Sequence, residues 1–373
     1  MNCNQENTVL ICSNYGWTIF NFRLPLIKSL KKNGYKVVVV TQYDGYEKQI
    51  AKYVDKIQPL FISRKGINPF YDLITLTHLF VNVLKARPNH LLLFTIKPVI
   101  YGSIVGRLLR ISSYSTITGL GTVFISNTWI TKIVKILYKT ALYKSKAVFF
   151  QNTDDRDIFL TEKLVSHNHI KMVPGSGIDL SKFKETQLLD SNPFIFTLIA
   201  RMLWDKGINE FIEAARAIKQ TNPDVIFQLL GPINVENRTA IPIKKMNEWI
   251  DDGIIQYLGE TNNVVKFIQN TSCVVLPSYR EGTSRVLLEA ASMCRPIIAT
   301  DVPGCREVVE DGYNGYLCEP KNSEDLANKI QNMILLPFSE RKKMGLNGRI
   351  KVSKEFDQSI VSSIYLEAIK ELN

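Results

Sequence analysis

The chain has 373 residues, of which 45% are hydrophobic and 22% charged, the balance of an ordinary globular protein. This composition excludes a disordered, collagen-like or coiled-coil chain, and the length predicts two domains. Six cysteines with no C-x-x-C pair exclude a disulfide scaffold and the usual spacing of a structural zinc site.

Positive charge is concentrated in the first half of the chain. Residues 1–190 carry 25 Lys and Arg against 12 Asp and Glu, whereas residues 191–373 carry 21 against 23. A basic half joined to a near-neutral half indicates an anionic partner for the first half. Nucleic acid, an acidic membrane leaflet and a phosphorylated substrate are the three candidates.

Apolar runs alternate with helical patterns along the first half. The runs predict strands at residues 8–12, 36–41, 90–95 and 146–151, and Gly34 ends a helix predicted at 21–33. Continuous apolar strands separated by helices indicate parallel β-α-β units with both sheet faces covered. We expect a cytoplasmic protein, because no run reaches the ~18–20 apolar residues that span a bilayer and no signal peptide is apparent.

The pattern breaks between Gly175 and Pro193 and then restarts. Further strands are predicted at residues 194–200, 225–230, 254–258, 273–276 and 296–300, with a helix at 208–221. The predicted fold is therefore α/β, with two doubly wound Rossmann-like domains at 1–185 and 186–355 and a C-terminal helix at 356–373. Ligands of such folds bind at the carboxyl ends of the strands, so we expect a site in a cleft between the domains.

The most informative segment follows the strand predicted at 273–276. Its polar loop contains Glu281 and Gly282, a helix is predicted from Thr283, and Glu289 lies inside that helix. Unpaired amide groups at a helix start suit a diphosphate, and a glycine allows close approach. Carboxylates at these two positions could accept hydrogen bonds from sugar and ribose hydroxyls. The alternative is an ordinary strand-loop-helix unit with surface carboxylates.

A second segment places two cations at the edge of the same predicted sheet. Arg201 ends the strand predicted at 194–200, and Lys206 with Gly207 leads into the next helix. A guanidinium fork and a mobile ammonium can together neutralise a leaving diphosphate. Solvated surface cations are the alternative for either residue alone.

These two segments together resemble the signature of retaining glycosyltransferases with the GT-B fold, in glycosyltransferase family 4. The resemblance spans nearly the whole chain. It is strongest toward bacterial enzymes that extend undecaprenyl-diphosphate-linked glycans, through Asn21–Leu30, Gly119–Gly121 and Ala200–Gly207.

The resemblance implies a role for each residue of the second domain. Arg201 and Lys206 would bind the donor diphosphate, assisted by the amides of Gly282, Thr283 and Ser284. The donor would be a nucleotide sugar, UDP-linked in our prediction, and no metal or other cofactor is expected.

Glu289 would hold the donor ribose, and Glu281 would orient the transferred sugar as part of the catalytic centre. Family members retain anomeric configuration by front-face attack, in which the leaving phosphate oxygen accepts the proton of the acceptor. Such chemistry depends on positioning and charge stabilisation. The first domain would bind the acceptor, a lipid-linked glycan.

Four residues of the first domain are candidates for the remaining contacts. Gly16, after the first strand, could let the backbone approach the donor phosphate, with a plain turn as the equal alternative. Arg23 and Lys97 are candidate contacts for the acceptor diphosphate. Many family members have a histidine in a loop that here contains Thr118, which is the fourth candidate.

The segment 128–146 mixes lysines with Trp129 and aliphatic residues at helical spacing and contains no acidic residue. A basic amphipathic helix with an aromatic edge can lie on an anionic membrane leaflet, whereas a helix that only covers the sheet is the alternative. The implied lipid-linked acceptor favours peripheral binding to the inner face of the plasma membrane, and nucleic acid is not expected as a partner. Asp155-Arg-Asp157 matches a metal-binding D-x-D pattern, but first-turn acidic residues of a helix explain it better.

Two other functions remain open at the sequence level. One is a nucleotide-sugar 2-epimerase on the same scaffold, although the acidic and histidine acid-base pairs of such enzymes are not evident. The other is a membrane- or nucleic-acid-binding module without catalysis, which would leave Glu281 and Glu289 unexplained.

Overall fold

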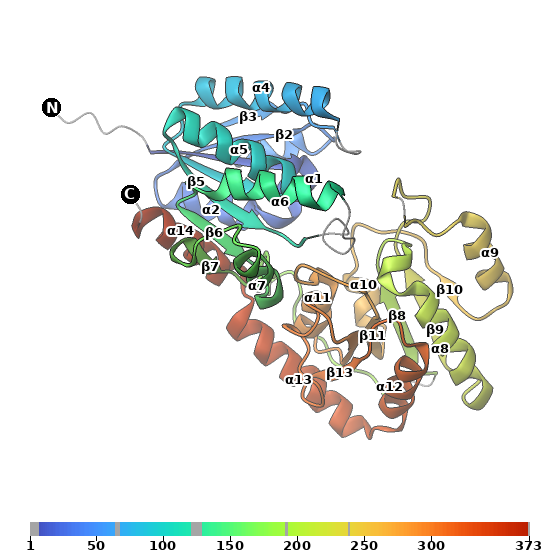
Figure 1. The fold of residues 1–373 in the computed structure, drawn as a ribbon. Helices are drawn as coiled ribbons and strands as arrows, with labels where there is room; N and C mark the ends of the chain where they lie inside the picture. Colours follow the sequence, from blue (N-terminus) through green and yellow to red (C-terminus); the bar gives the residue numbers. More distant parts are fainter. Residues whose placement is uncertain (1–6, 64–67, 121–128, 191–192, 238, 372–373) are drawn as a thin grey trace. The chain divides into compact units, whose positions relative to one another are not determined.

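The computed structural model describes residues 7–63, 68–120, 129–190, 193–237 and 239–371. It divides the chain into two compact units, residues 1–177 with 358–373 and residues 178–357 (Figure 1). The division falls at 177/178 and not at the expected 185/186, because Ile178 and Phe183 pack into the core of the second unit.

The first unit is built on a seven-stranded parallel sheet of order β3-β2-β1-β4-β5-β6-β7. At its centre, Ile11 of β1 lies opposite Val39 of β2 and Leu92 of β4. The strands are β1 (Thr8–Tyr15), β2 (Lys36–Gln42), β3 (Lys56–Pro59), β4 (His90–Phe94), β5 (Ser112–Ile117), β6 (Ala147–Phe150) and β7 (Ile170–Met172).

Helices cover both faces of this sheet. The helices are α1 (Gly16–Phe22), α2 (Leu24–Lys32), α3 (Glu47–Ile50), α4 (Pro69–Ala86), α5 (Ile96–Leu109), α6 (Trp129–Leu142), α7 (Thr153–Thr161) and the 3-10 turn η2 (His167–His169). The helix predicted at 21–33 is two helices broken at Arg23, with a proline in the first turn of α2. Helices α4, α5 and α6 lie side by side over one face (Figure 1).

The C-terminal helix α14 (Gln358–Glu371) belongs to the first unit. It packs beside α2 on the face opposite α4 to α6. Val361, Tyr365 and Ile369 are buried there against the sheet core, and Tyr365 Oη lies 2.9 Å from Thr116 Oγ1. The last helix in sequence thus completes the first core.

The second unit repeats the plan with a six-stranded parallel sheet of order β10-β9-β8-β11-β12-β13. Its strands are β8 (Ile195–Ile199), β9 (Ile226–Leu230), β10 (Gln256–Tyr257), β11 (Cys273–Leu276), β12 (Ile297–Thr300) and β13 (Gly315–Cys318). Its helices are η3 (Trp204–Lys206), α8 (Ile208–Thr221), α9 (Ile243–Asp251), α10 (Val265–Gln269), α11 (Arg285–Ser292), α12 (Ser323–Leu335) and α13 (Phe338–Glu355). Within the described ranges, no helix is both long and apolar enough to cross a membrane.

The strand order of the second sheet fixes where a ligand would bind. From β8 the chain moves outward to β9 and β10, and then returns to place β11 on the other side of β8. The loops that leave β8 and β11 therefore run in opposite directions and open a crevice between the carboxyl ends of these strands. This switch point carries the two sequence segments singled out above.

Candidate functional site

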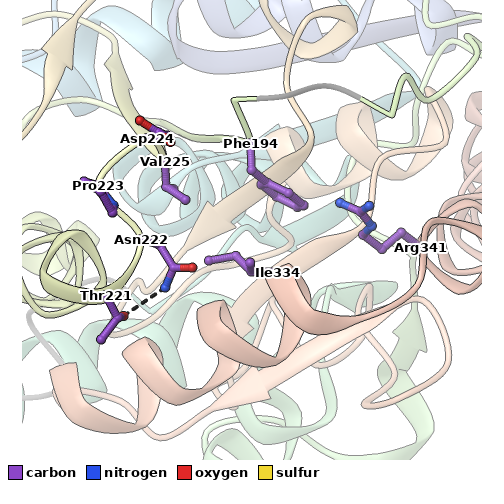
Figure 2. A pocket seen from close by; sticks show the side chains of 8 residues that line it. All are labelled: Phe194, Thr221, Asn222, Pro223, Asp224, Val225, Ile334 and Arg341. Atoms are coloured by element: carbon purple, nitrogen blue, oxygen red, sulfur yellow. Dashed lines mark hydrogen bonds between the residues drawn. The ribbon is translucent and has the colours of Figure 1, made fainter.

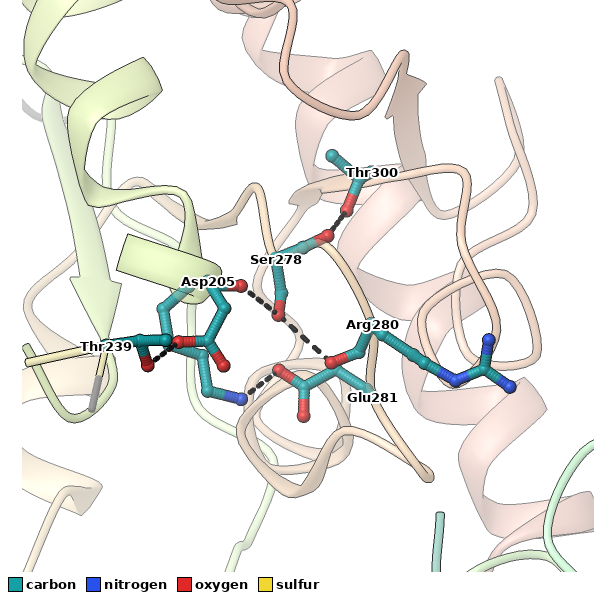
Figure 3. A network of polar contacts seen from close by, with 7 residues as sticks. Asp205, Thr239, Ser278, Arg280, Glu281 and Thr300 are labelled. Carbon is teal, nitrogen blue, oxygen red and sulfur yellow. Dashed lines mark hydrogen bonds and ion pairs between the residues drawn. The ribbon is translucent and has the colours of Figure 1, made fainter. Parts of the chain in front are cut away.

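Three loops converge at the carboxyl ends of β8, β11 and β12. The amide of Tyr279 donates to the carbonyl of Asp205 at 2.9 Å, which ties the loop after β11 to η3. The amide of Glu281 donates to the carbonyl of Pro303 at 3.1 Å, which ties it to the loop after β12. Ser278 is held from both sides, because its hydroxyl donates to the Asp205 carbonyl and its own carbonyl accepts from Thr300 Oγ1 (Figure 3).

Lys206 and Glu281 meet in this network. Lys206 Nζ lies 2.5 Å from Glu281 Oε1, and their side chains are 17% and 16% exposed. Solvent and salt screen such a sheltered ion pair less than a surface pair. Removing either side chain would leave the other charge partly buried without its partner. The structure thus brings together one residue from each of the two segments singled out in the sequence.

A glycine makes this close packing possible. Gly207 follows Lys206 with φ of +71°, and a Cβ atom there would lie 2.0 Å from the carbonyl oxygen of Pro277. Any larger residue would push the loop after β11 away from η3.

Thr239 is a third contributor to this network, and it was not predicted from the sequence. Its hydroxyl donates to Asp205 Oδ1 at 2.5 Å, and its carbonyl accepts from the amide of Trp204 at 2.8 Å. The segment that carries Thr239 comes from beyond β9, through Gly231 with φ of +142°. The Gly-Pro pair that follows β9 was the available signal for a sharp turn toward the site.

Helix α11 begins two residues later than predicted. Its first residue is Arg285, and Ser284 is the N-cap. The amide of Ser284 donates to the carbonyl of Gly304 at 2.9 Å, so it does not serve an incoming phosphate. The first-turn amides are those of residues 285–287, next to the half-buried Gly282 and Thr283.

Glu289 lies on α11 with its side chain 13% exposed. Burial raises the pKa of this carboxyl, while Arg285 and then Lys182 act in the opposite direction. Arg285 Nε donates to Glu289 Oε1 at 3.1 Å. The carboxylate is therefore oriented, little hydrated and equipped to accept a further hydrogen bond.

Arg201 occupies the same edge of the sheet but is solvent-exposed. It comes directly after β8, and its carbonyl accepts from the amide of Leu203 at 2.8 Å, which turns the chain toward η3. Of the four charged residues predicted in this unit, Lys206 and Glu281 contact each other, Glu289 pairs with Arg285, and Arg201 remains open to solvent.

Two of the predicted first-unit contacts are occupied by neighbouring carboxylates. The amide after Gly16 donates to Asp44 Oδ2 at 2.9 Å, so a carboxylate already lies where a donor phosphate was expected. Lys97 Nζ lies 2.7 Å from Asp72 Oδ1, with side chains only 18% and 13% exposed.

The other two first-unit residues differ in accessibility. Arg23 is 3% exposed, and its guanidinium carbon lies 4.0 Å from the ring centroid of Phe94, so it is a core cation and not the exposed one expected. Thr118 follows β5 and is half-buried, whereas Gly121 and Thr122 of the same loop lie outside the described residues.

The D-x-D match has a structural explanation. Asn152 is the N-cap of α7, and its side chain accepts from the amide of Asp155 at 2.8 Å. Asp155 is fully buried in that first turn. Across the described part of the chain, no three His, Cys, Asp or Glu side chains gather as metal ligands would.

A hollow of about 370 Å³ lies elsewhere in the second unit, where β8 and β9 begin (Figure 2). Its cation, Arg341, is already paired with Asp190 at 3.0 Å and stacked at 4.8 Å on the ring of Phe194. This hollow is at the amino edge of the sheet and does not belong to the site.

Two protein families match the chain. Residues 180–351 match the family described as glycosyl transferases group 1, and residues 8–152 match the family described as glycosyl transferase 4-like. The two matches fall within the second and the first unit respectively.

Similar proteins of known name cover almost all of the chain. An N,N'-diacetylbacillosaminyl-diphospho-undecaprenol alpha-1,3-N-acetylgalactosaminyltransferase from Campylobacter jejuni is 27% identical, over 95% of this chain and 96% of that protein. The capsular polysaccharide biosynthesis glycosyltransferase CapM from Staphylococcus aureus is 26% identical, over 92% and 93%.

Solved structures share the fold at low sequence identity. Anabaena HepE in complex with UDP-glucose has a TM-score of 0.80 at 18% identity, covering 98% of this chain and 99% of that one. Sucrose-phosphate synthase from Thermosynechococcus elongatus also has a TM-score of 0.80, at 17% identity, with coverage of 98% and 99%. With both family matches in their expected units, the chain is a glycosyltransferase of the GT-B fold.

Proposed function

We propose that the chain transfers a hexose or N-acetylhexosamine from a UDP-linked donor to a lipid-linked, undecaprenyl-diphosphate-type glycan, with retention of anomeric configuration. The observation that carries this proposal is the sheltered Lys206–Glu281 pair at the switch point of the second sheet. The names of the relatives from Campylobacter jejuni and Staphylococcus aureus support the acceptor class and a place in surface-glycan assembly.

Lys206 would bind the donor diphosphate while keeping its carboxylate partner. An ammonium has three donors, so it can serve Glu281 and a phosphate oxygen at once. Arg201, exposed at the same edge, would close over the diphosphate as a planar fork. With the amides of residues 285–287 these cations would offset the leaving-group charge, so the proposal needs neither metal nor cofactor.

The two carboxylates would position the donor. Glu289 would accept hydrogen bonds from the ribose hydroxyls, and Glu281 would orient the transferred sugar. Held in this way, the sugar is attacked on the face from which the diphosphate departs, and the departing oxygen takes the acceptor proton. The chain would work at the inner face of the plasma membrane, against an anionic surface, because the lipid-linked acceptor resides there.

The test is a panel of UDP-sugars assayed with defined lipid-diphosphate acceptors, using Lys206→Ala and Glu281→Ala. Losing a charge-stabilising contact of this kind costs about 100- to 1,000-fold in rate, and we expect at least that loss from each variant. Lys245→Ala is the matched control, because Lys245 forms an exposed pair with Glu248 at 3.0 Å and should keep full activity.

Either of two outcomes would refute the assignment. One is full transfer by Lys206→Ala or Glu281→Ala. The other is conversion of the sugar configuration without acceptor, which would mark an epimerase.

A further inference from the structure

A basic hollow lies at the amino edge of the first unit's sheet, next to the residues that precede β6 and β7. Its volume is about 690 Å³, and it lies between the end of α6 and the turns that follow α7. Four lysines and a histidine line it, from two separate chain segments, and are here called the lysine hollow: Lys139, Lys144, Lys146, Lys163 and His169.

The lysine hollow contains no balancing carboxylate. None of its lining residues is acidic, and in the described part of the chain none of its four lysines pairs with a carboxylate. Lys135, one turn before Lys139 on α6 and outside the lining of the hollow, shows the contrast, because it pairs with Glu162 at 2.8 Å. Four like charges around one hollow repel each other, and a bound anion would relieve that repulsion.

The neighbouring surface of α6 is apolar and exposed. Trp129 and Tyr143 are each 69% exposed, Ile136 is 65% exposed and Ile133 is 37% exposed. Spacings of four and three residues place Trp129, Ile133 and Ile136 on one side of the helix, and Tyr143 follows in the turn directly after it. These four residues are here called the α6 strip. Large apolar side chains beside lysines, with Trp and Tyr at the two ends, suit the boundary between lipid headgroups and acyl chains.

The α6 strip meets the lysine hollow at Tyr143, which ends the strip and also lines the hollow. Helix α6 has 14 residues and is about 21 Å long. Its first residue follows the carboxyl end of β5 and its last precedes β6. A bilayer in contact along α6 would therefore also lie close to the carboxyl edge of this sheet.

We propose that the lysine hollow binds the phosphate of an anionic phospholipid headgroup while the α6 strip inserts into the headgroup region of the same bilayer. Charge complementarity and the adjoining apolar strip are the observations that commit the site to a lipid surface. The inference also rests on the proposed function, whose lipid-linked acceptor requires a membrane.

Sedimentation of the full chain with vesicles tests the proposal. We expect binding to vesicles containing phosphatidylglycerol and little binding to pure phosphatidylcholine. Near a membrane each lysine contributes about fivefold in binding, so Lys144→Glu with Lys163→Glu should weaken binding by at least about 25-fold. Lys48→Glu with Lys52→Glu makes the same charge change at exposed positions outside this surface and should bind like the parent chain.

Further arms identify the anion and separate this proposal from the catalytic one. Equal vesicle binding by the two double variants would overturn it. The proposal would also be overturned if the chain did not bind vesicles but used Lys144 and Lys163 to bind another anion. Such binding would be detected as thermal stabilisation by inorganic phosphate or glycerol phosphate, or as binding of RNA. With a short-chain, water-soluble acceptor, the Lys144→Glu, Lys163→Glu variant should retain transfer. If the parent chain transfers no sugar to any such acceptor but still binds vesicles through Lys144 and Lys163, that result counts against the proposed function alone.

Discussion

Glu289 combines two opposing demands within a single side chain. Its position is sheltered, so ionisation costs free energy and its pKa is raised. The ribose hydroxyls of a donor would be better bound by the ionised form, which accepts hydrogen bonds at both oxygens. In the folded protein without donor, the ionised form of Glu289 therefore carries a free-energy cost, although this is the form that would bind the donor best.

Glu289→Gln separates these demands. Because the folded-state pKa lies above the unfolded one, the wild type gains stability as pH falls, and its penalty is present in full at alkaline pH. We expect the variant to melt no lower than wild type at pH 8, with the difference shrinking toward pH 4, while donor affinity falls at least tenfold. Thermal unfolding measures the melting temperature, and calorimetry with UDP measures the donor affinity. The control Glu213→Gln, at an exposed position of α8, should change neither quantity.

An unchanged affinity for UDP in Glu289→Gln would contradict the ribose role. A variant that melts well below wild type at pH 8 would instead show that the Arg285 pair outweighs the burial penalty.

At the scale of elements, the loop after β11 is fastened to α8 as well as to η3. Tyr279 Oη donates to Glu210 Oε1 at 2.7 Å, and Glu210 is only 8% exposed. Burial and the neighbouring carboxylates raise the pKa of Tyr279, so the phenol keeps its proton. This bond fixes the loop whose next residues include Glu281.

Tyr279→Phe should lower the free energy of unfolding by about 1.5–3 kcal/mol, the usual value of a hydrogen bond to a charged group. The KM for the donor should rise as well, because the loop is less well positioned. Adding Glu210→Gln to Tyr279→Phe should recover stability, since it removes the charge that lost its partner. If Tyr279→Phe unfolds like the parent in denaturant titrations, the fastening is unimportant.

The elements that were predictable from sequence are those with continuous apolar runs. The central strands β1, β2, β4, β6, β8 and β11 carry such runs, as does the strand-loop-helix unit around Glu281. Strand β5 was missed because it reads Ser-Ser-Tyr-Ser-Thr-Ile. Its buried serine and threonine hydroxyls find partners only in three dimensions, as Ser115 does with Ser103 at 2.9 Å. The short strands β3, β7 and β13 were missed because too few residues carry a pattern.

The site was predictable in part for the same reason. Lys206 and Glu281 follow adjacent strands, so parallel topology brings them to one edge. The partners of the Trp17 amide, next to Gly16, and of Lys97 are Asp44 and Asp72, which come from other segments and leave no local pattern in the sequence. Contacts between these donors and distant carboxylates can therefore be recognised only in the three-dimensional structure.

At the scale of the whole molecule, the chain returns at its end to complete the unit where it began. Removing residues 358–373 would take the buried side chains of Val361, Tyr365 and Ile369 from the first core. Each buried side chain of this size contributes about 1.5–3 kcal/mol, so their joint loss approaches the stability of a typical domain. A chain ending at Asp357 should therefore lose hydrogen-exchange protection in β1 and β2 but keep it in β8 and β11.

The point variant Tyr365→Phe is the control for that truncation. It removes only the hydroxyl that meets Thr116 and should keep protection throughout. Full protection of β1 in the truncated chain would show that α14 is dispensable for the first core.

Lowering the pH should destabilise the first unit before the second. All four histidines precede residue 170 and so belong to the first unit. His90 is 2% exposed, between the rings of Tyr35 and Tyr114 at 6.4 and 5.8 Å, and burial lowers its pKa. The folded state thus holds His90 neutral, whereas the unfolded state takes up a proton below about pH 6.5.

Stability of the first unit should consequently fall as pH drops through that value, by up to about 1.4 kcal/mol per pH unit for this one proton. Hydrogen exchange between pH 8 and pH 5, corrected for intrinsic rates, should show β4 losing protection before β11. His90→Phe should reduce this loss, because an aromatic ring of similar shape fills the position without a titrating nitrogen. His167→Gln, at an exposed position, should leave it unchanged, and an equal loss of protection in His90→Phe would place the acid sensitivity elsewhere.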